Sequence, residues 1–414
     1  MISGNKLPAR AWLVVGLLWL VGFLNYLDRG MITTMHGSLT EAIPMSDTQF
    51  GLLTSVFLWV YGLLSPFAGF LADQFNRSRV IIISLFAWSF TTFLTAHATT
   101  FGGLLATRAL MGISEACYIP AALALIADYH RGATRSLATG VHMTGVTVGY
   151  GLSGLGGWIA ERQGWSHAFL IFGLAGIVYT VVVALLLRDA PREQGTTITG
   201  ATANEAPPNV RLSEALVSLF SRGSFILAFA FWGLIGLAGW AVIGWMPTYL
   251  NEQFHLSQGT AGFSATGYLQ TAALIGLLVG GAWADRWSRT NQRGRIYVPV
   301  VGLLIAAPGI LLASSVNWLP FALAGLVLFG LARAFSDSNM MPILCMVSDP
   351  RYRATGYGVL NLFSCVIGGL TIYAGGVLRD ADVNVSRVFQ FGAVSLVVCA
   401  VLLFCIKPQA KANA

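Results

Sequence analysis

Charged residues are scarce in this chain of 414 residues, of which only 10% are Asp, Glu, Lys or Arg while 56% are hydrophobic. A soluble globular domain carries roughly 25% charged residues, because its surface must face water. The mean hydropathy of +0.70 points the same way. The shortage of charge excludes an ordinary soluble protein and indicates a chain that crosses a membrane many times.

Cysteine and histidine are also few and widely spaced. The five cysteines form an odd set without CxxC spacing, and all fall in apolar stretches, so they are expected to be small core residues rather than disulfides or metal ligands. The six histidines lie in different segments, and no HExxH, GxSxG or P-loop pattern occurs. We therefore predict no metal, no cofactor and no catalytic residue, and we expect that the protein is not an enzyme.

Long apolar stretches make up most of the chain, and twelve of them are long enough to cross about 30 Å of hydrocarbon. They lie near residues 11–38, 49–72, 79–98, 102–127, 136–159, 166–187, 223–250, 260–284, 296–314, 318–347, 354–378 and 385–406. A polar stretch with Pro207 and Pro208 divides six spans from six. The sequence predicts an all-α polytopic membrane protein with a six-helix bundle at 1–188, a cytoplasmic linker at 189–222 and a second six-helix bundle at 223–414.

Basic residues are distributed unevenly between the two sides of these spans. Eighteen of the 24 Lys and Arg fall on the side of the N-terminus, whereas only Arg162, Arg379 and Arg387 fall on the opposite side. The positive-inside rule then places both termini in the cytoplasm, and we expect a multi-pass protein of a bacterial inner membrane. Because the net charge of +7 is spread over loops beside the bilayer, anionic lipid headgroups rather than nucleic acid are the expected partner.

The two halves of the chain repeat each other. Asp73 closes the second span within Gly-Phe-Leu-Ala-Asp, and Asp285 closes the eighth within Gly-Ala-Trp-Ala-Asp. Arg135 opens the fifth span and Arg351 opens the eleventh, and each precedes a glycine by the same interval. Both pairs are separated by about half the chain. Such a constant offset indicates duplication, which is typical of transporters whose two halves enclose a site near the middle of the membrane.

These paired loops resemble the signature loop of the major facilitator superfamily, and the resemblance covers essentially the whole chain. In that family the motif Gly-x-x-x-Asp-Arg-x-x-x-Arg joins two helices; its Asp caps a neighbouring helix and its basic residues lock the outward-facing state. The resemblance implies gating loops at Gly69, Asp73 and Arg77 and, in a more complete copy, at Gly281, Asp285, Arg286 and Arg289. The first copy departs from the motif at Gln74, where Arg is usual.

Three acids and three arginines lie well inside the predicted spans, away from the span ends, where a charged side chain costs several kcal/mol and normally marks a transport route. The first span contains Asp28 beside Arg29, and the fourth contains Arg108 and Glu115, seven residues apart and therefore on one helix face. Such a carboxylate changes its protonation with the partner it has. We predict that Asp28 and Glu115 carry protons while Arg29 and Arg108 bind an anionic substrate; the alternative is a static cluster of salt bridges.

The third buried acid and the third buried arginine are Asp337 and Arg333 in the tenth span. Their spacing of four residues lets them form an ion pair within one helix. A purely structural pair and a contribution to the site are both open at this point.

The segments around the buried charges resemble two branches of the superfamily. Asn25-Tyr26-Leu27-Asp28-Arg29 and the stretch from Arg108 to Glu115 are similar to the anion:cation symporters, in which the matching acids take protons and the matching Arg binds carboxylate. Glu115-Ala116-Cys117-Tyr118 is similar also to the Spinster-like lysolipid transporters. The resemblance implies proton-coupled symport of a small organic anion, such as a sugar acid, by rocker-switch alternating access in a monomer; the alternatives are a lysolipid transporter or a proton-coupled exporter.

Further substrate contacts are expected from the residues beside these charges and from helices that line the pore in this fold. They are Asn25, Tyr26, Tyr118, His142, Trp240, Gln270 and Asn361.

Overall fold

In the computed structural model the described residues are 9–130, 134–190, 212–291, 293–349 and 352–407; of residues 69–74, 212 and 354 only the backbone is described. Every regular element in these ranges is a helix. The predicted all-α class is therefore confirmed. Its physical reason is that a backbone surrounded by hydrocarbon must satisfy its own hydrogen bonds, which a helix does within one segment.

The first half of the chain forms nine α-helices and one short 3₁₀ turn. They are α1 (Ala9–Met31), η1 (Ile32–Thr34), α2 (His36–Ala42), α3 (Asp47–Gln74), α4 (Arg77–Thr95), α5 (Phe101–Glu115), α6 (Tyr118–Tyr129), α7 (Arg135–Gly151), α8 (Gly154–Gln163) and α9 (Trp165–Leu186). Polar caps mark two of the starts, since Asn76 accepts from the amide of Arg79 before α4, and Thr100 from the amide of Gly103 before α5.

The second half repeats this plan after one short helix. Its elements are α10 (Leu212–Phe220), α11 (Gly223–Gln253), α12 (Gln258–Phe263), the π-helical turn η2 (Ser264–Tyr268), α13 (Leu269–Ser288), α14 (Gly294–Ser315), α15 (Leu319–Asp337), α16 (Met340–Val347), α17 (Arg353–Asp380) and α18 (Ser386–Cys405). Helix α10 lies inside the predicted linker 189–222, whose residues 191–211 are outside the described part of the chain.

Eleven helical segments among the described residues are long and apolar enough to span a membrane. The remaining predicted span, 136–159, is not one helix but two, because α7 ends at Gly151 and α8 begins at Gly154. Backbone hydrogen bonds from Leu152 to Val148 and from Leu155 to Leu152 carry the chain across this break. Glycine has low helix propensity, which explains why the glycine-rich span breaks here.

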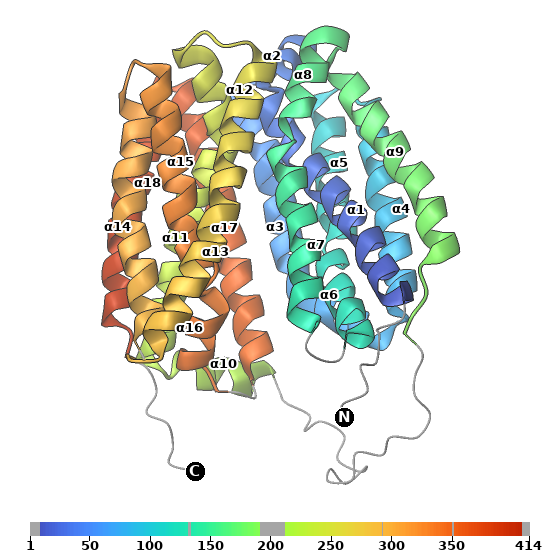
Figure 1. Ribbon diagram of the computed structural model, residues 1–414. Helices are drawn as coiled ribbons and strands as arrows, with labels where there is room; N and C mark the ends of the chain where they lie inside the picture. The colour runs from blue at the N-terminus through green and yellow to red at the C-terminus, as the bar shows by residue number, and fades with distance from the viewer. Residues whose placement is uncertain (1–8, 131–133, 191–211, 292, 350–351, 408–414) are drawn as a thin grey trace.

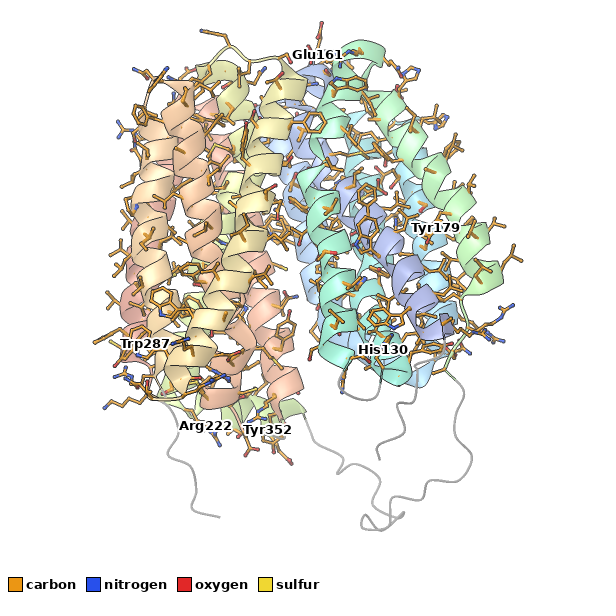
Figure 2. All side chains as sticks on the ribbon, viewed as in Figure 1. His130, Glu161, Tyr179, Arg222, Trp287 and Tyr352 are labelled. Atoms are coloured by element: carbon orange, nitrogen blue, oxygen red, sulfur yellow. The ribbon has the colours of Figure 1, made fainter. Side chains whose placement is uncertain are left out.

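The helices stand in two groups (Figure 1): α1 to α9 form one, and α11 to α18 the other. Helix α10 lies at the end of the molecule where α1 begins and α18 ends, which we call the α10 end. The opposite end holds α2, α8 and α12, and we call it the α8 end. Figure 2 places Glu161 at the α8 end and Arg222 at the α10 end. The exact division into bundles at 1–188 and 223–414 stays a prediction.

The two groups meet mainly where α3 packs against α17 and where α8 packs against α12, and α7 also contacts α13. Within the first group α7 packs closely on α1. A Cβ added at Gly149 of α7 would lie 2.1 Å from the carbonyl oxygen of Phe23 in α1. Small residues thus allow α1, which holds Asp28 and Arg29, to approach its neighbour at backbone distance.

Candidate functional site

Arg29 and Glu115 form a buried ion pair in the first group of helices. Arg29 Nη2 lies 2.8 Å and Nε 3.1 Å from the same oxygen, Oε2 of Glu115. The exposed fractions of the two side chains are 5% and 0%. Arg29 sits in the last turn of α1, and Glu115 is the last residue of α5. Two helix ends thus bring an acid and a guanidinium together, away from the outer water.

Aromatic rings surround the guanidinium of Arg29. Its Cζ atom lies 4.4 Å from the ring centre of Tyr26, 4.6 Å from that of Tyr61 and 4.9 Å from that of Phe57. Rings at these distances stabilise a cation and leave its edge free to donate hydrogen bonds. Tyr26 was expected from the sequence, whereas Tyr61 and Phe57 of α3 were not. Tyr61 could have been suspected because it is a tyrosine inside an apolar span. Its contact with Arg29, however, depends on how α3 packs on α1.

Asp28 is buried apart from the arginines. Its Oδ2 accepts a hydrogen bond of 3.3 Å from the Thr92 hydroxyl of α4, while its buried Oδ1 has no partner. Within the described part of the chain, no arginine forms an ion pair with Asp28. Of the four predicted charges, only Arg29 and Glu115 form an ion pair among the described residues in this conformation. Asp28 and Arg29 are adjacent in sequence but about 100° apart around α1, so they face different helices.

Arg108 is fully buried without a carboxylate partner among the described residues. Its Nε lies 3.4 Å from the carbonyl oxygen of Leu53, its Nη1 lies 2.9 Å from the sulfur of Met111, and its Nη2 has no partner. Its Cζ lies 4.9 Å from the Phe57 ring, which also faces Arg29. The site thus contains one paired cation, Arg29, and one cation held only by a carbonyl, a sulfur and a ring.

Three other predicted contacts belong to the first group. Asn25 lies next to the ion pair, with its Oδ1 3.5 Å from Arg29 Nη2. Tyr118 and His142 are fully buried, and both bind the carbonyl oxygen of Leu18, at 2.9 and 3.1 Å. In this conformation they join α6 and α7 to α1, and a role for them in binding substrate stays a prediction.

The predicted residues of the second half lie at helix contacts. Asn361 donates to Ser65 across the two groups at 3.2 Å. Gln270 packs against Gly151, also across the groups, whereas Trp240 packs against Gly368 within the second group. In the part of the chain that the structure describes, no hydrogen bond joins these three to Arg29.

Arg333 and Asp337 form an ion pair of 3.0 Å within α15, with side-chain exposed fractions of 24% and 29%. They are therefore less buried than their positions inside a predicted span imply. The pair is local to one helix and does not contact Arg29 or Glu115 in any interaction of the described residues.

The predicted gating loops lie at the α10 end. Arg77 bonds to Asp128, and Asp285 bonds to Arg295 of α14 at 2.9 Å. Asp285 therefore binds a side chain in this conformation. Arg286 and Arg289 are exposed, and Gly281 lies in α13. Gly69 and Asp73 fall in the stretch 69–74, outside the residues whose side chains are described.

Known proteins resemble this chain over nearly its whole length. A family model described as Major Facilitator Superfamily matches residues 18–372 and 235–413. An MFS-type efflux pump of Mycolicibacterium smegmatis is 27% identical over 90% of this chain and 86% of its own. Protein spinster homolog 1 of Xenopus laevis is 26% identical, over 90% of this chain and 73% of its own length. A probable sulfoacetate transporter, SauU, of Cupriavidus necator is 24% identical, over 96% of this chain and 94% of its own length.

A solved structure shares the fold. The crystal structure of a bacterial homolog to the human lysosomal transporter Spinster, inward-facing and unoccupied, superposes with a TM-score of 0.74. It is 24% identical, and the match covers 97% of this chain and 96% of that chain. The predicted resemblance and the expectation of a transporter rather than an enzyme are confirmed. The helices, their duplication and these matches lead to one conclusion: the chain is a multi-pass membrane protein that belongs to the Major Facilitator Superfamily of transporters.

Proposed function

We propose that this protein is a secondary active transporter that moves a small organic anion together with protons by rocker-switch alternating access. The observation that carries the proposal is the buried ion pair, in which one oxygen of Glu115 accepts two hydrogen bonds from Arg29. A guanidinium also binds a substrate carboxylate through charge-assisted hydrogen bonds. The carboxylate of Glu115 and a substrate carboxylate can therefore replace each other at Arg29, and the displaced Glu115 takes up the proton.

Protonation of Glu115 is the exchange step. When Glu115 takes a proton it loses its negative charge, and Arg29 would then be a buried cation without a counter-ion. Because breaking a buried ion pair is strongly unfavourable, an anionic substrate that binds Arg29 restores the balance. Substrate binding and protonation thus favour each other, which is the thermodynamic basis of symport.

Asp28 and Arg108 complete the charge balance of the site. With both acids ionised, two carboxylates offset two guanidinium groups, although only Arg29 and Glu115 are in contact. With both acids protonated, two positive charges remain in a buried region, and an anion is attracted there. Asp28 is the second proposed proton carrier, and Arg108 the second proposed anion ligand.

The conformation fits one stage of this cycle. Contacts between the two groups of helices occur at the α8 end, where Gln258 of α12 binds Ser38 of α2. At the α10 end the ion pairs of Arg77 and Asp285 each stay within one group. We propose that the structure is open toward the cytoplasm, with both termini on that side of a bacterial inner membrane, and that its site is waiting to release or accept protons.

A lysolipid transporter or a proton-coupled exporter is the alternative. It is favoured by the similarity to an efflux pump and to a spinster homolog, at 27% and 26% identity, against 24% for the anion transporter. Both alternatives keep the exchange step at Glu115 but change the cargo or the direction. The alternatives and anion symport can be told apart by identifying the compound whose transport moves protons.

The test is proton movement in proteoliposomes that contain the wild type, E115Q or E41Q. Glu41 is an exposed acid of α2 and serves as the matched control. The vesicles are challenged in turn with sugar acids, small carboxylates including sulfoacetate, and lysolipids. We expect an anion to raise the external pH for the wild type and E41Q but not for E115Q. If only a lysolipid moves protons, anion symport is rejected in favour of the alternative.

A further inference from the structure

The α8 end contains a carboxylate that reaches from the second group of helices to the first. Asp380, the last residue of α17, accepts hydrogen bonds from the backbone amides of Asp47 and Thr48, both at 2.9 Å. These amides begin α3, and the first amides of a helix have no partner inside it. A carboxylate also suits the positive end of the helix dipole. Asp380 therefore caps a helix of the other group.

A second carboxylate reaches in the opposite direction. Glu161 of α8 accepts a hydrogen bond of 3.1 Å from the backbone amide of Gly259, at the start of the span Gln258–Ser288. Figure 2 shows Glu161 at the α8 end of the first group. Each group thus supplies one acid to the first turn of a span in the other group.

The internal repeat relates these two contacts. Glu161 lies at the outer end of the fifth span, and Asp380 lies at the outer end of the eleventh. The amides that they cap, those of Asp47 and Gly259, lie at the starts of the second and eighth spans. Glu161 and Asp380 are separated by about half the chain, and so are Asp47 and Gly259. Asp73 and Asp285 of the repeated loops have a similar separation. The two caps are one contact made twice by the duplicated halves.

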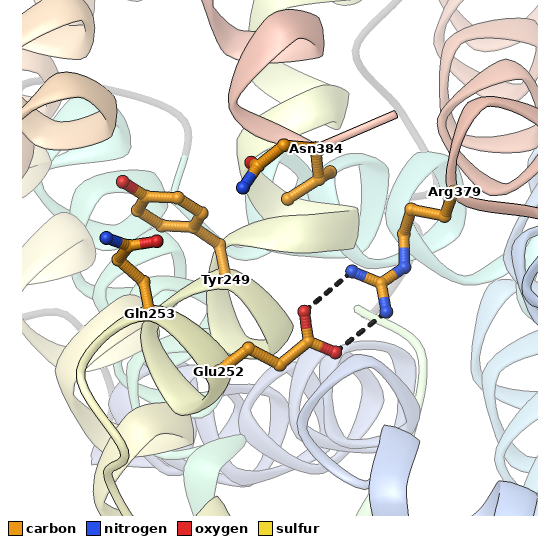
Figure 3. A pocket seen from close by; sticks show the side chains of 6 residues that line it. Tyr249, Glu252, Gln253, Arg379 and Asn384 are labelled. Atoms are coloured by element: carbon orange, nitrogen blue, oxygen red, sulfur yellow. Dashed lines mark hydrogen bonds and ion pairs between the residues drawn. The ribbon is translucent and has the colours of Figure 1, made fainter. Parts of the chain in front are cut away.

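An ion pair reinforces one of the two caps. Arg379 donates from Nε to Asp47 across the groups at 3.0 Å. Its two terminal nitrogens bind Glu252 of α11 at 2.8 and 2.7 Å, as the close view shows (Figure 3). The other oxygen of Asp47 lies 2.6 Å from Nε2 of His36. Glu252 therefore holds Arg379 in the orientation that reaches the first group.

We propose that Glu161 and Asp380 form a duplicated latch that holds the α8 end closed and releases it when this end opens. Both carboxylates are exposed, so that water can replace the amides as partners when the groups separate. The ion pairs that the gating residues Arg77 and Asp285 form at the α10 end each lie within one group. The proposal rests on alternating access, but it concerns which end is closed and not what is transported.

The experiment measures distances between nitroxide labels by pulsed electron resonance on the purified full chain, with the five native cysteines changed to alanine. One pair of labels, T99C with S315C, reports the α8 end; a second pair, S136C with T290C, reports the α10 end. All four positions are exposed, and each pair joins one group to the other. The variant E161A/D380A removes both carboxylates. E41A removes an exposed acid of α2 that has no hydrogen bond or ion pair among the described residues.

We expect E161A/D380A to raise the ratio of long to short distances at the α8 end about tenfold, as the loss of two caps predicts, and to shorten those at the α10 end. E41A should match the wild type. An unchanged distribution at the α8 end in a folded double variant rejects the latch. If the double variant does not fold, E161A and D380A are measured separately. The latch is rejected if neither single variant lengthens the distances at the α8 end. The readout needs no substrate, so a failure of the latch is distinct from a failure of anion symport.

Discussion

At the scale of residues, one oxygen of Glu115 accepts hydrogen bonds from two nitrogens of Arg29, and three aromatic rings lie within 4.9 Å of the guanidinium carbon. This arrangement needs a flat, forked cation. Lysine has a single compact ammonium and does not form the same fork. The chemistry of the site therefore depends on the shape of Arg29 as well as on its charge.

R29K should lower the initial rate of anion uptake about 10- to 100-fold, because charge-assisted hydrogen bonds worth about 1.5–3 kcal/mol are lost. The measurement is uptake of labelled substrate into proteoliposomes. R162K is the control, since Arg162 is exposed at the end of α8 and its guanidinium lies over the Trp158 ring at 4.0 Å. Equal rates for R29K and the wild type would remove Arg29 from the site.

E115Q should separate exchange from net transport. Glutamine resembles protonated glutamate in shape and charge, so Arg29 stays available to the anion while no proton is released. We expect exchange of internal for external substrate to persist in E115Q and to be independent of pH. Wild-type net uptake should increase as the external pH falls, because protonation precedes anion binding. Loss of exchange in folded E115Q would show that Glu115 binds substrate rather than protons.

At the scale of elements, helix ends position the charges. Helix α5 ends at Glu115, and α6 begins only at Tyr118, so the carboxylate sits at a break within the fourth span. The fifth span breaks between Gly151 and Gly154, beside the π-helical turn η2, where Thr266 bonds to the carbonyl oxygen of Gly151. The break in the fifth span and the turn η2 lie where the two groups meet, and the glycines there allow close backbone approach.

G149A should destabilise the protein by about 1–3 kcal/mol, the usual cost of overpacking. The added methyl group would lie 2.1 Å from the carbonyl oxygen of Phe23, and backbone cannot move aside as a side chain can. Thermal unfolding in detergent measures the effect. G140A, on the same helix with no heavy atom within 4 Å of the added carbon, is the matched control and should unfold at or slightly above the wild-type temperature, because alanine has the higher helix propensity.

At the scale of the whole molecule, the described helices form two groups that meet along α3 with α17 and along α8 with α12. Among the described residues, the basic side chains outside the spans lie mostly at the α10 end, whereas Arg162, Arg379 and Arg387 lie at the α8 end. This asymmetry predicts which end faces the cytoplasm.

Reporter fusions test the orientation. A fluorescent protein fused after the C-terminus should fluoresce, because it stays in the cytoplasm, whereas alkaline phosphatase fused there should be inactive. Phosphatase inserted after Gln163, at the α8 end, should be active because it lies outside. The opposite pattern would reverse the orientation and assign the latch of Glu161 and Asp380 to the cytoplasmic side.

Much of the fold was predictable because its signals are local. Span length, apolar composition and the repeated loops are read along the chain, and they predicted an all-α duplicated membrane protein. The buried charges were predictable for the same reason, since Asp28, Arg29, Arg108 and Glu115 stand out in apolar segments. The two-helix form of the fifth span was missed, because the turn at Leu152 and Ser153 remains inside one apolar stretch.

The sequence by itself thus determined the class of protein and its duplication, and it singled out the buried charges that we propose to take part in transport. Only the tertiary structure decided which acid meets which cation: Glu115 binds Arg29, and Asp28 faces Thr92 on another helix. Only the tertiary structure placed Tyr61 beside the guanidinium of Arg29. It also placed Glu161 and Asp380 at helix starts in the opposite group. The physical reason is that side chains about 100° apart on one helix face different neighbours, and packing between distant segments chooses those neighbours.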